Sequence, residues 1–206
     1  MCPYPGGIVG QRDFNGDGFA DILWRDNAGN VAIWLMNGTT VQSTAVIGNA
    51  ATSWSVAGTG DFDGERLADI LWRDNAGNVA IWLMNGTTVQ STAVIGNVPI
   101  SWGISGTGDF NGDRKSDLVW RDSTGNVAIW LMNGIAIRSS VVIGNVPTSW
   151  FVAETGDFNG DGLSDLLWRD NVGNVAIWFM NGIAIQSSVI IGNVPTSWTI
   201  QGDNAD

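Results

Sequence analysis

Oxygen-bearing side chains are concentrated in the nine-residue segment DFNGDGFAD, residues 13–21. Carboxylates this close together repel one another unless a positive charge lies among them. Counted from its first aspartate, the segment carries oxygen side chains at positions 1, 3, 5 and 9 and glycine at position 4. Ca²⁺ takes roughly six to eight oxygen ligands and accepts the irregular geometry that a short loop offers. The spacing therefore predicts a Ca²⁺ site.

The same spacing returns at Asp61, Asp109 and Asp157, a constant step of 48 residues. Turn-forming residues alone could explain one such loop, but four copies of one spacing favour the metal. Thirteen of the twenty acidic residues lie in these loops, and four Ca²⁺ ions would change the net charge from −11 to −3. The predicted ligands, with a backbone carbonyl from position 7 in the first and fourth loops, are Asp13, Asn15, Asp17, Phe19 and Asp21; Asp61, Asp63, Glu65 and Asp69; Asp109, Asn111, Asp113 and Asp117; and Asp157, Asn159, Asp161, Leu163 and Asp165.

The four loops differ at position 6. The first and fourth have glycine there, where a positive φ is expected, whereas the second has Arg66 and the third has Arg114 followed by Lys115. A cationic side chain beside the ion weakens its binding, and Glu65 is longer than the aspartate it replaces. We therefore expect tighter binding at the first and fourth loops, and the second loop to be the one most distorted or left empty.

The segments that flank these loops are predicted to be short strands. In the second repeat they span 53–58, 68–73, 78–84 and 88–96, and the acidic loop joins the first strand to the second. Asn85-Gly86 predicts a type I′ turn between the last two. No segment shows a 3.6-residue hydrophobic period over a useful length. Units of about 40–50 residues with four antiparallel strands are typical of β-propeller blades.

The predicted fold is therefore all-β, one propeller domain over 1–206 with four 48-residue, four-stranded antiparallel blades at approximately 1–49, 50–97, 98–145 and 146–193. A tryptophan recurs in the first strand of each later repeat, but Gly6 stands at that place in the first. A strand at 197–202 with Trp198 would close the ring by completing the first blade, although residues 6–11 overlap the same register. Two closures stay open: a four-bladed monomer, or an eight-bladed homodimer, which the smaller wedge angle per blade favours.

DFNGDGFAD and DFNGDGLSD, with the ILW or LLW strand that follows, resemble the FG-GAP/VCBS repeats of integrin-type β-propellers. The resemblance covers nearly the whole chain. It implies calcium loops between the first two strands of a blade, an extracellular or cell-surface location, and a role in adhesion or ligand binding. Some propellers of this type are lectins. The chain departs from the pattern at Glu65, Arg66 and Arg114.

Composition narrows the function classes. A net charge of −11 disfavours nucleic acids and anionic membrane surfaces as partners. No apolar run is long enough for membrane insertion, and no signal peptide is visible. The chain has no histidine, one cysteine and no G-x-S-x-G motif, so we expect it not to be an enzyme.

Two kinds of ligand remain open for a calcium-binding recognition or scaffold module. One is another protein. The other is carbohydrate, because the chain has 12 tryptophans, and their flat faces stack on sugar rings. Most of these tryptophans occupy repeat positions inside predicted strands and are expected in the core. Carbohydrate sites, if present, are therefore expected between blades, repeated and individually weak.

Overall fold

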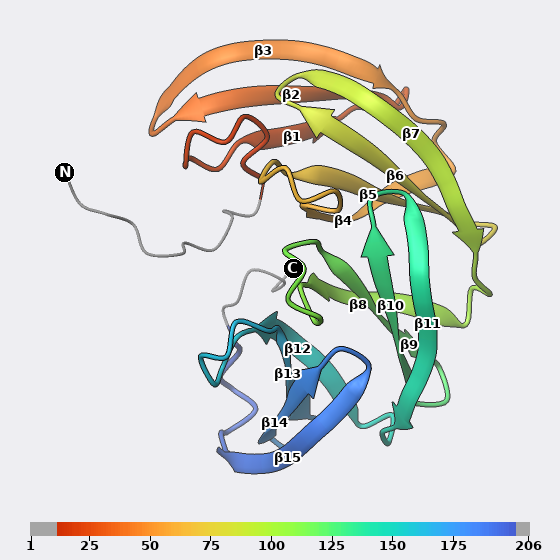
Figure 1. Ribbon diagram of the computed structural model, residues 1–206, viewed down its shortest axis with the longest axis vertical. Helices are drawn as coiled ribbons and strands as arrows, with labels where there is room; N and C mark the ends of the chain where they lie inside the picture. The colour runs from red at the N-terminus through yellow and green to blue at the C-terminus, as the bar shows by residue number, and fades with distance from the viewer. Residues whose placement is uncertain (1–11, 201–206) are drawn as a thin grey trace. The chain divides into compact units, whose positions relative to one another are not determined.

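A computed structural model describes residues 12–200 of the chain (Figure 1). Its regular structure is entirely β, which confirms the predicted class for the described part. The strands are β1 (Ile22–Arg25), β2 (Asn30–Asn37), β3 (Thr40–Asn49), β4 (Trp54–Gly60), β5 (Asp69–Asp74), β6 (Asn78–Asn85), β7 (Thr88–Asn97), β8 (Trp102–Gly108), β9 (Asp117–Asp122), β10 (Asn126–Asn133), β11 (Ala136–Asn145), β12 (Trp150–Gly156), β13 (Asp165–Asp170), β14 (Asn174–Asn181) and β15 (Ala184–Asn193).

The strands form separate antiparallel sheets, each built from consecutive strands. Three sheets have four strands, β4 to β7, β8 to β11 and β12 to β15, and the sheet of β1 to β3 has three within the described residues. The four strands predicted for the second repeat are confirmed as β4 to β7, with bounds that differ by at most two residues. The sheets are the blades that the repeat predicted, and separate antiparallel sheets of consecutive strands are consistent with a propeller.

The chain falls into two compact units, Met1–Val98 and Pro99–Asp206. In the first unit, side chains of the β1–β3 and β4–β7 sheets share one hydrophobic cluster that includes Phe14, Ile33 and Trp72. In the second unit, Phe110, Ile129 and Trp168 take the same places between the β8–β11 and β12–β15 sheets. Each unit therefore contains one complete junction between consecutive blades.

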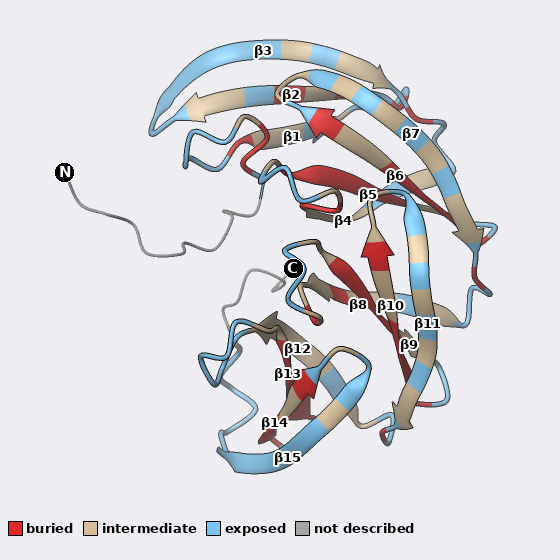
Figure 2. Ribbon diagram, in the orientation of Figure 1, coloured by how far each residue is buried: buried red, intermediate tan, exposed pale blue. Residues whose placement is uncertain are grey.

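Burial differs across a blade. Residues 69–72 of β5 are buried on both faces, whereas β7 alternates between exposed and half-buried side chains (Figure 2). An inner strand packed on both faces needs a continuous apolar run, and an outer strand with one solvated face alternates. The tryptophans follow this gradient: Trp72, Trp120 and Trp168 are fully buried, whereas Trp24 is 46% and Trp198 is 68% exposed. The expectation that most tryptophans are core residues holds fully only for these three buried tryptophans.

The hairpin between β6 and β7 differs from the predicted turn. Asn85 pairs with Thr88, so the two-residue loop is Gly86-Thr87. Gly86 has a φ of +59°, and neither Asn85 nor Thr87 has a positive φ. Positive φ at the first loop residue alone is the φ pattern of a type II′ turn, which places glycine there. The prediction of a tight hairpin is confirmed, and its type I′ assignment was wrong.

Ring closure is not shown. Residues 197–200 form no strand. The remainder of the predicted closing strand and the competing segment 6–11 lie outside the described residues. The choice between a four-bladed monomer and an eight-bladed homodimer stays a prediction, as do the blade boundaries and the single domain over 1–206.

Candidate functional site

The first aspartate of each acidic loop organises the loop backbone. In the second loop, Asp61 Oδ1 accepts a hydrogen bond from the N–H of Gly64 at 2.7 Å, and its Oδ2 accepts one from Arg66 at 2.7 Å. Asp63 Oδ1 accepts the N–H of Glu65 at 3.2 Å. The bond between Glu65 and Asp63 is an Asx turn, and together the three bonds hold the loop in a tight curve.

The aspartate at position 9 ties the loop to the sheet. Asp69 begins β5 and is fully buried. Its Oδ2 accepts the N–H of Phe62 in the loop, and its Oδ1 accepts the N–H of Met84 in β6, both at 2.8 Å. The same pair of bonds recurs at Asp21, Asp117 and Asp165. This second role was missed from the sequence, where position 9 was read only as a ligand.

Three carboxylates converge in the second loop. Asp61, Asp63 and Asp69 each offer an oxygen, and these oxygens lie within 4.8 Å of one another. Among the residues that the structure describes, no other group of three acidic side chains does so. Oxygens on opposite sides of a Ca²⁺ ion, each at about 2.4 Å, are about 4.8 Å apart. The donor set therefore fits one divalent cation.

Burial makes this cluster costly without a cation. Desolvation raises the pKa of Asp69 to about 7, and the charges of Asp63 and Asp61 add to the rise, against the backbone hydrogen bonds that lower it. The pKa of Asp61 is also raised, first by desolvation and then by Asp63. The ionised form of a carboxylate with a raised pKa is stabilised when a positive charge enters its surroundings. Desolvation likewise raises the pKa of the position 9 aspartate in the other loops, to about 7 at Asp117 and above its ordinary value at Asp21 and Asp165.

The other three loops share the backbone curve but carry asparagine at position 3. The first aspartate bonds to the N–H groups at positions 4 and 6 in each, as Asp13, Asp109 and Asp157 do. Asn15 and Asn159 each donate from Nδ2 to the aspartate at position 5, Asp17 and Asp161; Asn111 Oδ1 accepts the N–H of Asp113. At position 7, the N–H groups of Phe19 and Leu163 donate to Asp17 and Asp161. In the second loop, the side chain at position 5, Glu65, is exposed.

Position 6 needs a left-handed backbone in every loop. Gly18 and Gly162 have φ of +87° and +85°, and Arg66 and Arg114 adopt +67° and +66°. Glycine adopts this region without steric cost, whereas other residues are strained there by about 1 kcal/mol. The expected positive φ is therefore confirmed, and the two arginines occupy it at a cost.

In each unit, the acidic loop of the first blade also joins that blade to the second. The carbonyl of Asp13 accepts the N–H of Ala68 at 2.8 Å, and the carbonyl of Phe14 accepts the N–H of Gly86 at 2.7 Å. In the second unit Asp109 and Phe110 bond in the same way to Ser164 and Gly182. A cation that stiffens a loop would therefore also stiffen the junction between two blades.

The arginine that ends the second strand of the first blade bonds to the segment that links two blades. Arg25 donates from Nη2 to the carbonyls of Ala50 and Ala51, at 3.0 and 2.8 Å, and its guanidinium lies 5.8 Å from the ring centroid of Trp72. Asp26 instead accepts hydrogen bonds from Ala28 and Asn30. The arginine thus fastens the link between two blades, whereas Asp26 stabilises the turn that follows its own strand.

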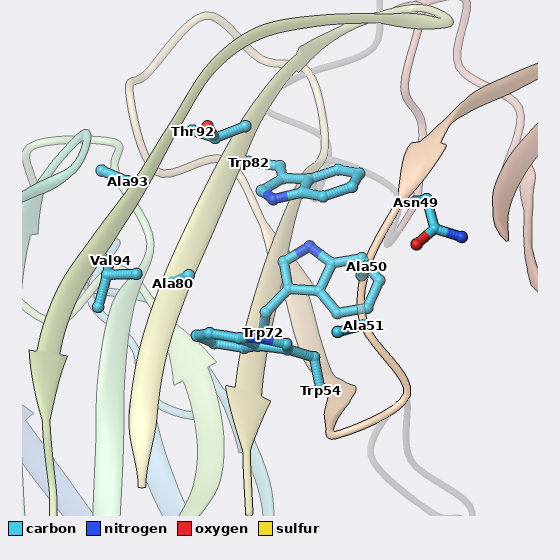
Figure 3. A pocket seen from close by; sticks show the side chains of 10 residues that line it. All are labelled: Asn49, Ala50, Ala51, Trp54, Trp72, Ala80, Trp82, Thr92, Ala93 and Val94. Atoms are coloured by element: carbon cyan, nitrogen blue, oxygen red, sulfur yellow. The ribbon is translucent and has the colours of Figure 1, made fainter. Parts of the chain in front are cut away.

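A tryptophan-lined cavity lies at the junction in each unit. The first has a volume of about 420 Å³ and is lined by Asn49, Ala50, Ala51, Trp54, Trp72, Ala80, Trp82, Thr92, Ala93 and Val94. Figure 3 shows the indole of Trp72 lying between those of Trp54 and Trp82. The second is about 200 Å³ and is lined by Val146, Trp150, Trp168, Ala176, Trp178, Ser188, Val189 and Ile190. All eight residues of the second stand 96 positions after residues of the first, so the two cavities are equivalent.

Comparison with known proteins agrees with this architecture. The family model of the FG-GAP-like repeat matches three times in overlapping windows, at residues 13–72, 61–120 and 109–168. Each window begins at the first aspartate of an acidic loop and ends at the buried tryptophan of the next blade. No curated protein matches the chain significantly. No helix in the described residues is long and apolar enough to cross a membrane. The matched windows extend over most of the sequence, and the chain belongs to the FG-GAP-like repeat family.

Proposed function

We propose that the chain is a calcium-binding, non-catalytic recognition or scaffold module that acts in adhesion or ligand binding at the cell surface or outside the cell. FG-GAP-like repeats are generally non-catalytic binding modules and are typical of extracellular proteins. The acidic loops supply oxygen donors, the ligands that Ca²⁺ prefers. When bound, the ion would supply positive charge that offsets the repulsion among these carboxylates.

The observation that carries this proposal is the convergence of Asp61, Asp63 and Asp69 around one point, with Asp69 fully buried. Two hydrogen bonds hold each of Asp61 and Asp69 in place before any ion arrives. A preorganised donor set binds with a smaller loss of conformational entropy. The loops would thus receive the ion with little rearrangement.

The loops are proposed to bind with unequal affinity. Residue types favour the first and fourth loops, which lack arginine at position 6. Carboxylate geometry favours the second, because Asp63 replaces the asparagine found in the others. Calorimetric titration of the metal-free chain with Ca²⁺ distinguishes these. If Asp63→Asn removes the tightest class of sites, carboxylate geometry sets the order of affinity among the loops. If that class persists, the residue types at position 6 set the order.

Titration with Ca²⁺ also tests the proposal itself. We expect saturable binding, with Mg²⁺ weaker because its smaller, strictly octahedral shell does not suit an irregular loop. Asp69→Asn should remove binding at the second loop, whereas Asp74→Asn, outside the loop, should leave the titration unchanged. The proposal fails if the metal-free chain takes up no Ca²⁺ at millimolar concentration.

Carbohydrate is the alternative to a protein ligand. The two equivalent cavities at blade junctions favour it, because each exposes part of several tryptophan faces. A glycan array separates this reading from a protein-binding scaffold. For assembly, we propose the eight-bladed homodimer over the four-bladed monomer, and light scattering of a monodisperse monomer would reject it.

A further inference from the structure

We propose that the cavity between Trp54, Trp72 and Trp82 binds an uncharged pyranose ring, and that side chains at its counterpart near Trp178 narrow that cavity against the same ring. This inference rests on the proposed recognition role but not on the metal. It names a ligand class, one site and the residues that restrict the second.

The aromatic faces are the first support. Trp72 is buried, and its ring centroid lies 5.0 Å from that of Trp82 at an interplanar angle of 48°. Trp54 and Trp82 are only half-buried, so parts of their faces remain accessible from the cavity. Gly48 in β3 permits this arrangement, because a Cβ there would lie 3.2 Å from the Trp82 ring. Accessible indole faces suit the C–H face of a sugar ring.

Polar groups at the rim are the second support. Asn49 uses its Nδ2 to donate to the carbonyl of Ala28 and to Asn30 Oδ1, both at 3.0 Å. These bonds fix the amide, and Figure 3 shows its oxygen on the side of the cavity. The oxygen is thereby preset as an acceptor for a hydroxyl. Thr92, the cross-strand partner of Trp82, places a second hydroxyl-bonding group on the opposite wall.

Charge selects the ligand class. None of the ten residues that line the cavity is charged, although the chain carries a net charge of −11. A cationic ligand would find no carboxylate there, and an anionic one would be repelled by the protein as a whole. A neutral ring with an apolar face and several hydroxyls matches both the tryptophans and the rim. Its expected affinity is weak, because few polar groups are available to pair with those hydroxyls.

The two cavities differ at four of the eight positions that line both. Ala50, Thr92, Ala93 and Val94 correspond to Val146, Ser188, Val189 and Ile190, whereas the three tryptophans and the alanine beside them are the same. The larger aliphatic side chains accompany a fall in volume from about 420 to about 200 Å³. Small-molecule sites usually span roughly 300–1,000 Å³. Only the first cavity lies in that range.

The test titrates the full chain, held in excess Ca²⁺, with a panel of methyl pyranosides of glucose, galactose, mannose and xylose. The readout is the indole N–H signals in NMR spectra. We expect at least one sugar to shift the signals of Trp54 and Trp82 with millimolar affinity, and cyclohexanol, which lacks the ring of hydroxyls, to bind at least tenfold more weakly. If no sugar shifts these signals at 50 mM as a rough ceiling, or if cyclohexanol binds equally well, the inference is overturned.

Exchanging the side chains between the cavities provides the matched control. The variant Ala50→Val, Ala93→Val, Val94→Ile should bind the sugar at least tenfold more weakly and keep its fold, since the second unit carries these residues at equivalent positions. The reverse variant, Val146→Ala, Val189→Ala, Ile190→Val, should add a second set of shifting signals from Trp150 and Trp178. Unchanged affinity in the first variant would refute the assignment. Calcium uptake is measured in a separate titration, so that failure of sugar binding can be told apart from failure of the metal proposal.

Discussion

Two turns of the second blade, residues 61–69 and residues 74–78, contain aspartates whose pKa values are shifted in opposite directions. Asp74 accepts hydrogen bonds from the amide and N–H of Asn78, both at 2.7 Å, and these bonds, the amide bond foremost, lower its pKa. In the acidic loop, burial raises the pKa of Asp69 to about 7, and two further carboxylates lie nearby. A lone carboxylate with enough donors is stable by itself, whereas a buried cluster favours a bound cation. The comparison separates an ordinary acidic turn from a candidate metal site.

The largest expected effect comes from replacing the buried aspartate of the acidic loop, Asp69, with asparagine; the same replacement of Asp74 in the other turn is the control. Asp69→Asn replaces an acceptor that faces the N–H groups of Phe62 and Met84 with a group that cannot accept both. We expect it to lower the free energy of unfolding by about 2–3 kcal/mol, the cost of a buried donor without its partner. Urea unfolding in chelator measures this. The comparison fails if Asp74→Asn, at a half-buried position, destabilises the chain as much.

Removal of Ca²⁺ has an expected effect of similar size at each occupied site. An ion present at 100 times its dissociation constant stabilises the fold by about 2.7 kcal/mol per site, which corresponds to a melting-temperature rise of roughly 5–10 °C for a chain of this size. Thermal unfolding with Ca²⁺ and with chelator measures the difference, and Mg²⁺ serves as the control ion. An unchanged melting temperature after exhaustive chelation would leave the acidic loops no different from ordinary turns.

Arg114→Gly should stabilise the third loop. The arginine holds a φ of +66°, where glycine is unstrained, so we expect a gain of about 0.5–1 kcal/mol in the free energy of unfolding. Removal of its charge should also tighten Ca²⁺ binding at that loop. The reciprocal control is Gly162→Arg in the fourth loop, which should lose stability and affinity. Opposite signs in the two variants support the assignment; equal signs contradict it.

The smallest expected effect is on the stability of the fold at low pH. Against desolvation, which would raise it, hydrogen bonds from Asn126 and Thr124 lower the pKa of Asp122 to about 2, from an ordinary value of 3.8. A lowered pKa in the folded state adds stability that is present above the unfolded value and disappears as the pH falls through about 2. Unfolding midpoints in chelator, measured between about pH 4 and pH 2, should therefore fall less steeply for Asp122→Asn than for the unchanged chain. Parallel curves would refute this.

The repeating parts of the fold were predictable from the sequence. The 48-residue step and the alternation of short apolar runs with turns placed β4 to β7 within two residues. The left-handed backbone at position 6 followed from Gly18 and Gly162. Such features depend on local backbone preferences, which sequence spacing reports directly.

The junction between blades was harder to predict. The bond from Arg25 to the carbonyl of Ala50 joins residues of different blades, and spacing along the chain does not reveal such partners. The predicted turn at Asn85 failed because the strands pair one residue further, which only the register shows. The difference in cavity volume comes from methyl and methylene groups at positions such as Ala50 and Val146, whose effect depends on packing in three dimensions.

The duplicated stretch at 20–49 and 68–97 has a consequence for folding. It gives β2–β3 and β6–β7 the same sequence and the same register, with Ala32 opposite Val46 and Ala80 opposite Val94. During refolding from denaturant, a strand of one hairpin can pair with its twin at almost no energetic disadvantage, and repeat proteins are prone to such swaps. Only the divergent segments between the copies, such as Glu65-Arg66, tell the two apart. Synthesis from the N-terminus, which lets the first hairpin form before its twin exists, would avoid this ambiguity.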